Sequence, residues 1–133
     1  MIRRLVDSTN GTTAIEFALV LPLILMLVFG TFETGRAFYT YHNLQATADE
    51  LARYLFISYG EQDITRAQLV RDTEIWLRNH YRYGDPAQIK VSGSVGKQDN
   101  IKYREFVLGQ QISLTIPMVD VSFNIQATRQ LPY

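Results

Sequence analysis

The sequence predicts an α+β fold in which one long N-terminal helix carries a small head, made of a second helix and an antiparallel sheet. Three observations predict it. An apolar run extends from Ala14 to Phe32, apolar residues then recur at helical spacing as far as Tyr59, and the last third of the chain alternates apolar with polar residues. With 133 residues the chain holds one domain at most.

The first half of the long helix is long enough to cross a membrane. At about 1.5 Å per residue, the segment from Ala14 to Phe32 spans close to the roughly 30 Å of the hydrocarbon layer. Arg3 and Arg4 precede it and favour a cytoplasmic N-terminus. A cleaved signal peptide is the alternative, but the apolar run is longer than a usual signal core and no small-residue cleavage pattern ends it. We therefore expect a retained anchor.

The second half of the helix is amphipathic. Between Phe38 and Tyr59 the apolar residues are spaced by three and four positions, without an intervening proline. We expect one helix from Thr12 to Ser58, with Tyr59 and Gly60 ending it.

Two local features stand out in the long helix, which we call the stem. Pro22 has no N–H to donate and predicts a kink, and its role is either in assembly or of no special purpose. Phe38, Tyr39 and Tyr41 either form an aromatic belt at the lipid headgroups or pack as ordinary helix residues.

The remaining residues predict the head. A helix from Thr65 to Tyr81 can be capped by Asp63 or Thr65. The alternating patterns predict strands whose apolar faces cover the outer half of the stem. The predicted strands and connections are strands at Gln88–Val95, Gln110–Ile116 and Val121–Thr128, a polar loop at Ser92–Asn100, and a hairpin turn at Pro117–Asp120.

Glu16 is the most informative residue. It is the only charge between Ala14 and Phe32, and an acidic side chain at a membrane helix centre costs about 2.5 kcal/mol or more. Such a residue therefore indicates a function. Gly11 stands five residues before it and Phe17 directly after it.

This pattern of a glycine, four residues and Glu-Phe opening an apolar helix resembles the processing motif of type IV pilin-like proteins. The stretch from Gly11 to Leu25 is similar to the opening of TadE-like proteins, pseudopilins of the tight-adherence (Tad, or Flp) pilus system. The Glu33-Thr34-Gly35-Arg36 element and a helix over residues 44–54 follow in the order seen in that family. The resemblance covers residues 11 to about 55, and the head matches only in style.

The resemblance implies how the chain is divided. Residues 1–11 would be a cytoplasmic leader, cleaved by a prepilin peptidase between Gly11 and Thr12. Residues 12–32 would be the transmembrane half of the stem and 33–59 its amphipathic half, with 60–133 as a periplasmic head. The Glu16 carboxylate, followed by Phe17, would interact with a subunit's N-terminal amine and set the register of assembly.

The implied function is that of a minor pilin or pseudopilin in the inner membrane, which primes, caps or regulates a Tad-type pilus used in surface adhesion. Its partners would be the prepilin peptidase, the inner-membrane platform, and other minor pilins or the major pilin. The alternative is an unprocessed, membrane-tethered periplasmic domain that binds a ligand or a protein. Cleavage at Gly11 distinguishes the two.

Other functions find little support in the sequence. The net charge of zero argues against a nucleic-acid partner, and there is no cysteine. His42 and His80 suit packing or surface positions, and no catalytic or nucleotide-binding motif is present. We expect no enzyme, catalytic residue, cofactor or metal. Glu33 and Arg36, three residues apart, are expected to pair with each other rather than between subunits.

Overall fold

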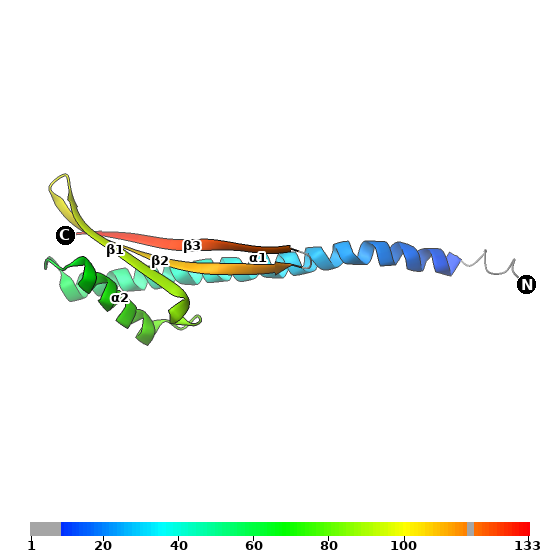
Figure 1. Cartoon of the computed structure of the whole chain (residues 1–133), viewed down its shortest axis with the longest axis horizontal. Coiled ribbons are helices and arrows are strands. Elements are labelled where there is room, and N and C mark those ends of the chain that lie inside the picture. The colour runs from blue at the N-terminus through cyan, green and yellow to red at the C-terminus, as the bar shows by residue number, and fades with distance from the viewer. Residues whose placement is uncertain (1–8, 117–118) are drawn as a thin grey trace, which may run out of the picture.

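The computed structural model describes residues 9–116 and 119–133. Figure 1 shows a long helix with a short second helix and a three-stranded sheet gathered at its C-terminal half. This arrangement confirms the predicted α+β fold. The elements in chain order are α1 (Thr9–Tyr59), α2 (Arg66–His80), the short 3₁₀ helix η2 (Pro86–Gln88), β1 (Ile89–Gln98), β2 (Ile101–Ile116) and β3 (Val119–Pro132).

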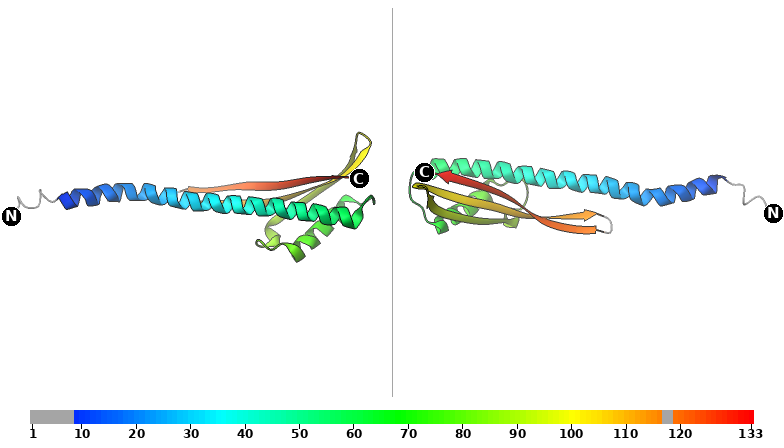
Figure 2. Two further views of the ribbon diagram at one scale, coloured as in Figure 1. Left: turned by 180° about the vertical axis from the view of Figure 1, so that it is seen from behind. Right: turned by 90° about the horizontal axis from the view of Figure 1, so that it is seen from above.

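Helix α1 is continuous, as the sequence predicts, and begins three residues before the expected Thr12. It runs through Pro22, and in Figure 2 (right) it bends in the blue N-terminal part that contains this proline. Gly60 ends the helix with a positive φ of 48°, and its N–H donates to the Phe56 carbonyl at 2.9 Å. Arg3 and Arg4 of the predicted leader lie outside the described residues.

Helix α2 starts at a capping box. The Gln68 N–H donates to Thr65 Oγ1 at 3.2 Å, and the Thr65 N–H donates to Gln68 Oε1 at 2.9 Å. Thr65, rather than Asp63, is therefore the cap. The buried side of α2 carries Leu69, Thr73, Trp76 and Leu77, whereas Ala67 in its first turn is exposed.

The sheet is antiparallel throughout, in the order β1-β2-β3. The predicted polar loop over Ser92–Asn100 is wrong, because β1 stays paired with β2 as far as the Gln98–Ile101 pair. The chain reverses at Asp99 and Asn100, whose φ angles of 47° and 69° suit a two-residue hairpin turn. The second half of β1 is mostly polar and contains glycine, so its sequence does not show the alternation typical of a strand.

Strand β2 is also longer than predicted and includes residues 101–109, for which the sequence pattern predicts no element. Its inward positions include Arg104 and Gln110, both buried, which interrupt the apolar alternation that would reveal a strand. Ile116 pairs with Val119 at the end of the β2–β3 hairpin. The expected turn begins with Pro117 and Met118, which lie outside the described residues.

The core forms where the sheet and α2 meet the C-terminal half of α1, as expected. Figures 1 and 2 show the β2–β3 hairpin running along α1, with its free end directed toward the helix's N-terminal half. Fully buried residues come from α1, α2 and the sheet, among them Leu44, Ala48, Leu51, Leu55, Leu69, Phe106, Leu108 and Ala127. The N-terminal part of α1 extends beyond this core, and the described residues include no element that covers it.

Candidate functional site

The uncovered part of α1 is a continuous apolar surface. None of its most apolar window is buried, and that window has a mean hydropathy of 2.3. A helix of this length and composition is consistent with a single-pass membrane anchor. Its exposed apolar side chains include Ile15, Phe17, Leu19, Leu23, Leu27 and Phe32.

Glu16 lies on this surface and is exposed to the surroundings. Among the described residues it has no hydrogen-bond or ion-pair partner. Phe17 beside it is 60% exposed. The structure therefore places the predicted register residues on a bare stretch of helix, where no other described residue serves as a partner.

Gly11 and Thr12 lie inside the first turns of α1, which begins at Thr9. The predicted cleavage position is thus helical in the intact chain. Cleavage there would leave Thr12 as the first residue of the helix, one turn before Glu16. Side chains on a helix lean toward its N-terminus, so the Glu16 carboxylate lies on the side of that new amine.

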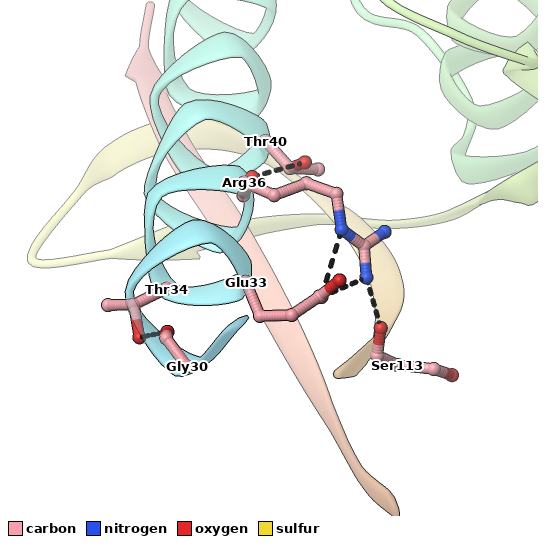
Figure 3. A network of polar contacts seen from close by, with 6 residues as sticks. All are labelled: Gly30, Glu33, Thr34, Arg36, Thr40 and Ser113. Carbon is pink, nitrogen blue, oxygen red and sulfur yellow. Dashed lines mark hydrogen bonds and ion pairs between the residues drawn. The ribbon is translucent and has the colours of Figure 1, made fainter. Parts of the chain in front are cut away.

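Glu33 and Arg36 form an ion pair, as expected from their spacing. Arg36 Nη2 and Glu33 Oε2 are 2.6 Å apart, and Arg36 Nε also donates to the same oxygen at 3.1 Å. Arg36 Nη2 donates as well to the main-chain carbonyl of Ser113 in β2 (Figure 3). Arg36 therefore links the stem to the hairpin, a contact that no sequence pattern could reveal.

Gly35, the third residue of the stem motif, and Gly30 lie in the middle of a helix. A Cβ added at either would meet nothing within 4 Å. Glycine costs about 1 kcal/mol relative to alanine in a helix interior, and no contact among the described residues explains it here. Small residues at such positions allow another helix to approach closely.

The two histidines occupy packing positions. The exposed His42 lies against Tyr41, with ring centroids 5.7 Å apart. His80 stacks on Trp76 at 4.8 Å, and its ring nitrogen lies 3.0 Å from the Trp76 carbonyl oxygen. Within residues 9–116 and 119–133, no group of three or more histidine, aspartate or glutamate residues could hold a metal ion.

Together, a bare apolar stem and an α+β head packed on its far half define a pilin-like arrangement. The family model of TadE-like proteins matches residues 11–53, which confirms the resemblance over the segment that contains Glu16 and the Glu33–Arg36 element. This family consists of pilus components and is not a known enzyme family. No curated protein and no solved structure matches the chain.

Proposed function

We propose that this chain is a minor pilin, or pseudopilin, of a Tad/Flp-type pilus. It would sit in the inner membrane with its N-terminus in the cytoplasm and its head in the periplasm, and would prime, cap or regulate assembly of a pilus used in adhesion. Its partners are the prepilin peptidase, the inner-membrane platform, and other minor pilins or the major pilin. The match to TadE-like proteins over residues 11–53 supports an association with the Tad system.

The exposed, unpartnered Glu16 carries the proposal. In a lipid environment its carboxylate is costly, and the cost falls when an ammonium group of a neighbouring helix pairs with it. Because a single axial offset brings the two charges together, this pair fixes the register between subunits. The open surfaces at Gly30 and Gly35 further support close approach of another helix.

The first experiment determines the intact mass and N-terminal sequence of the protein from its native host, with and without the prepilin peptidase. A chain that begins at Thr12 only when the peptidase is present is the expected result. A chain that keeps its leader in both strains would instead support the tethered binding domain. A start beyond Phe32 would contradict both.

A second experiment tests Glu16 itself. The Glu16→Gln variant should still insert in the membrane but should no longer co-purify with its partner subunits, because the neutral amide cannot offset an ammonium charge. Glu33→Gln is the matched control, since it removes a carboxylate that already has a partner in its own chain. Normal co-purification of the Glu16 variant would count against the proposed register role.

A further inference from the structure

A groove runs between α2 and β1, the strand at one edge of the sheet (Figure 1). It consists of two hollows of about 580 and 330 Å³. Glu74 of α2 and Val91 of β1 line both hollows, so the two adjoin and form one channel along the strand. Ala67 and Val70 of α2 add small apolar side chains to its wall.

The direction of the main-chain groups in β1 follows from a contact at the opposite edge of the sheet. Gln45 Nε2 in α1 donates to the Gln126 carbonyl in β3 at 3.3 Å, so this carbonyl points away from β2. Gln126 faces Gly109 in β2, and a central strand directs alternate residues to its two neighbours. Gly109 therefore directs its main-chain groups to its partner Lys90 in β1. From Lys90 onward, every second residue of β1 points to β2 and the residues between point to the free edge.

The outward groups of β1 lie beside the groove and are unpaired. Ile89 belongs to the outward set, and its N–H donates to the Pro86 carbonyl of η2, which agrees with this direction. Among the described residues, no hydrogen bond reaches the outward main-chain groups of Val91, Gly93 and Val95. Such a row of free donors and acceptors pairs readily with an extended chain.

The charges in the groove indicate what kind of chain would pair there. Three exposed arginines and one exposed glutamate line it: Arg66, Arg71, Arg78 and Glu74. Arg71 pairs with Asp72 at 3.4 Å, whereas the side chains of Arg66 and Arg78 form no ion pair with any described residue. An extended segment with acidic side chains is therefore attracted to the groove, and a basic one is repelled.

A second copy of the chain does not suit this edge. Its own β1 carries Lys90 and Lys97 and no acidic residue, so pairing of two β1 strands would bring lysines toward the arginines. Lysine on an edge strand is a common means of preventing such self-pairing. The charges therefore favour an acidic segment of a different protein.

We propose that an extended, acidic segment of a partner protein adds to the sheet as a fourth strand, beside β1 and against α2. Its main chain pairs with the outward groups of Val91, Gly93 and Val95, and its carboxylates lie near the arginines of α2. This surface belongs to the head and goes beyond the proposed role of Glu16, on which it does not depend.

The test uses the full chain in detergent micelles and a fluorescein-labelled peptide of alternating valine and glutamate, about eight residues long, within the usual length of a strand. Fluorescence anisotropy measures its binding. A second peptide has lysine in place of glutamate, and a third is the glutamate peptide N-methylated at every peptide bond, which removes its main-chain donors. We expect the glutamate peptide to bind and each change to weaken binding several-fold.

Amide hydrogen exchange, followed residue by residue by nuclear magnetic resonance, locates the bound peptide. The glutamate peptide should slow the exchange of the outward amides of Val91, Gly93 and Val95 several-fold. The amides of Ser92 and Ser94, which point to β2, should change little. Unchanged exchange at the outward amides with the peptide bound would overturn the proposed strand pairing.

Two variants test the arginines. Arg66→Gln and Arg78→Gln should each weaken binding of the glutamate peptide several-fold, because each removes a positive charge from the groove. Arg53→Gln is the matched control, since Arg53 is an exposed arginine of α1 that does not line the groove. Circular dichroism verifies that each variant is folded.

Three further outcomes would overturn the proposal. Equal binding of the lysine and glutamate peptides would contradict an acidic partner, and undiminished binding of the N-methylated peptide would contradict main-chain pairing. Slower exchange at Val91 and Gly93 when the protein alone is concentrated would show that a second copy occupies the edge. None of these results concerns cleavage at Gly11 or the Glu16 variant, so this proposal and the proposed function fail separately.

Discussion

At the scale of single residues, Arg104 is a buried charge that connects distant parts of the head. It is 1% exposed, and Nη2 donates to the carbonyl oxygens of Gly60 and Gln62 at 2.9 and 2.5 Å. Its guanidinium lies 3.9 Å from the centroid of the Tyr133 ring. One side chain in β2 thus donates hydrogen bonds to two carbonyl groups of the turn that follows α1, and it also packs against the C-terminal Tyr133.

Replacing Arg104 should destabilise the head. Arg104→Lys keeps the charge but loses the planar group that can stack and donate in two directions. Each hydrogen bond to a charged group contributes about 1.5–3 kcal/mol, so we expect a loss of that order. Urea unfolding in detergent micelles, followed by Trp76 fluorescence, measures it. The exposed Arg78→Lys control should unfold like the wild type, and an unchanged midpoint for Arg104→Lys would contradict the prediction.

At the scale of elements, the contact between α2 and β1 depends on a glycine. A Cβ at Gly93 would lie 3.1 Å from Leu69 Cδ2, 3.3 Å from the Glu105 carbonyl oxygen and 3.4 Å from Val70 Cγ2. Gly93, which makes this part of β1 resemble a loop in the sequence, therefore allows α2 to approach the strand closely. Gly109 in the neighbouring strand has no such restriction, since its nearest contact would be 3.8 Å away.

Gly93→Ala should therefore lower the free energy of unfolding by about 1–3 kcal/mol through overpacking. The matched Gly109→Ala variant should stay within about 1 kcal/mol of the wild type, because its new methyl group meets ordinary contacts. Unfolding curves of the two variants, recorded side by side, measure the difference. Equal midpoints would show that α2 moves without cost and that the packing at Gly93 is loose.

At the scale of the whole molecule, stem and head are not separate folding units. Leu44, Ala48, Leu51 and Leu55 of α1 are fully buried in the core of the head. The predicted head of residues 60–133 thus begins at the end of an element, but the core that stabilises it extends into the amphipathic half of the helix.

Truncation tests this sharing of the core. A fragment of residues 33–133 should fold and melt cooperatively, whereas 60–133 should not. Losing a buried leucine already costs about 2–5 kcal/mol, and three leucines and an alanine together exceed much of the 5–15 kcal/mol that typically stabilises a domain. Near-ultraviolet circular dichroism during heating distinguishes the two. A cooperative melt of the shorter fragment would contradict a shared core.

Two ion pairs connect the sheet to the helical part and give the molecule a pH dependence. The hydrogen bond from Arg129 lowers the pKa of Asp49, and those from Lys102 and Tyr133 lower the pKa of Asp63. A carboxylate with a lowered pKa stabilises the fold above its unfolded pKa, and that contribution is lost as the pH falls through the folded pKa.

Stability should therefore decline as the pH falls below about 3.9, the ordinary value for aspartate. The double variant Asp49→Asn, Asp63→Asn should be less stable near neutral pH and should show a shallower decline on acidification. Thermal midpoints between neutral and strongly acidic pH measure both effects, with Asp99→Asn at the exposed β1–β2 turn as control. Parallel curves for variant and wild type would show that these pairs do not respond to pH.

The sequence by itself determined the stem, the second helix, the Glu33–Arg36 pair and the presence of three strands, whereas it left the cap of α2 open between Asp63 and Thr65. These features depend on local properties, namely apolar periodicity and side chains three or four residues apart. Both involve residues that are close together in the sequence. Glu16 and Gly11 could be recognised for the same reason, and their roles stay predictions.

Only the tertiary structure decided the extent of β1 and β2, the burial of Arg104, and the contact of Arg36 with Ser113. Each of these depends on residues far apart in the chain. Gly93 and Arg104 interrupt the alternating strand pattern, and only their contacts with distant residues explain why they occupy strands. The exposed face at Phe123, whose side chain is 37% exposed, belongs with them, because strand alternation predicts which residues share a face but not whether the molecule has enough surface to cover it.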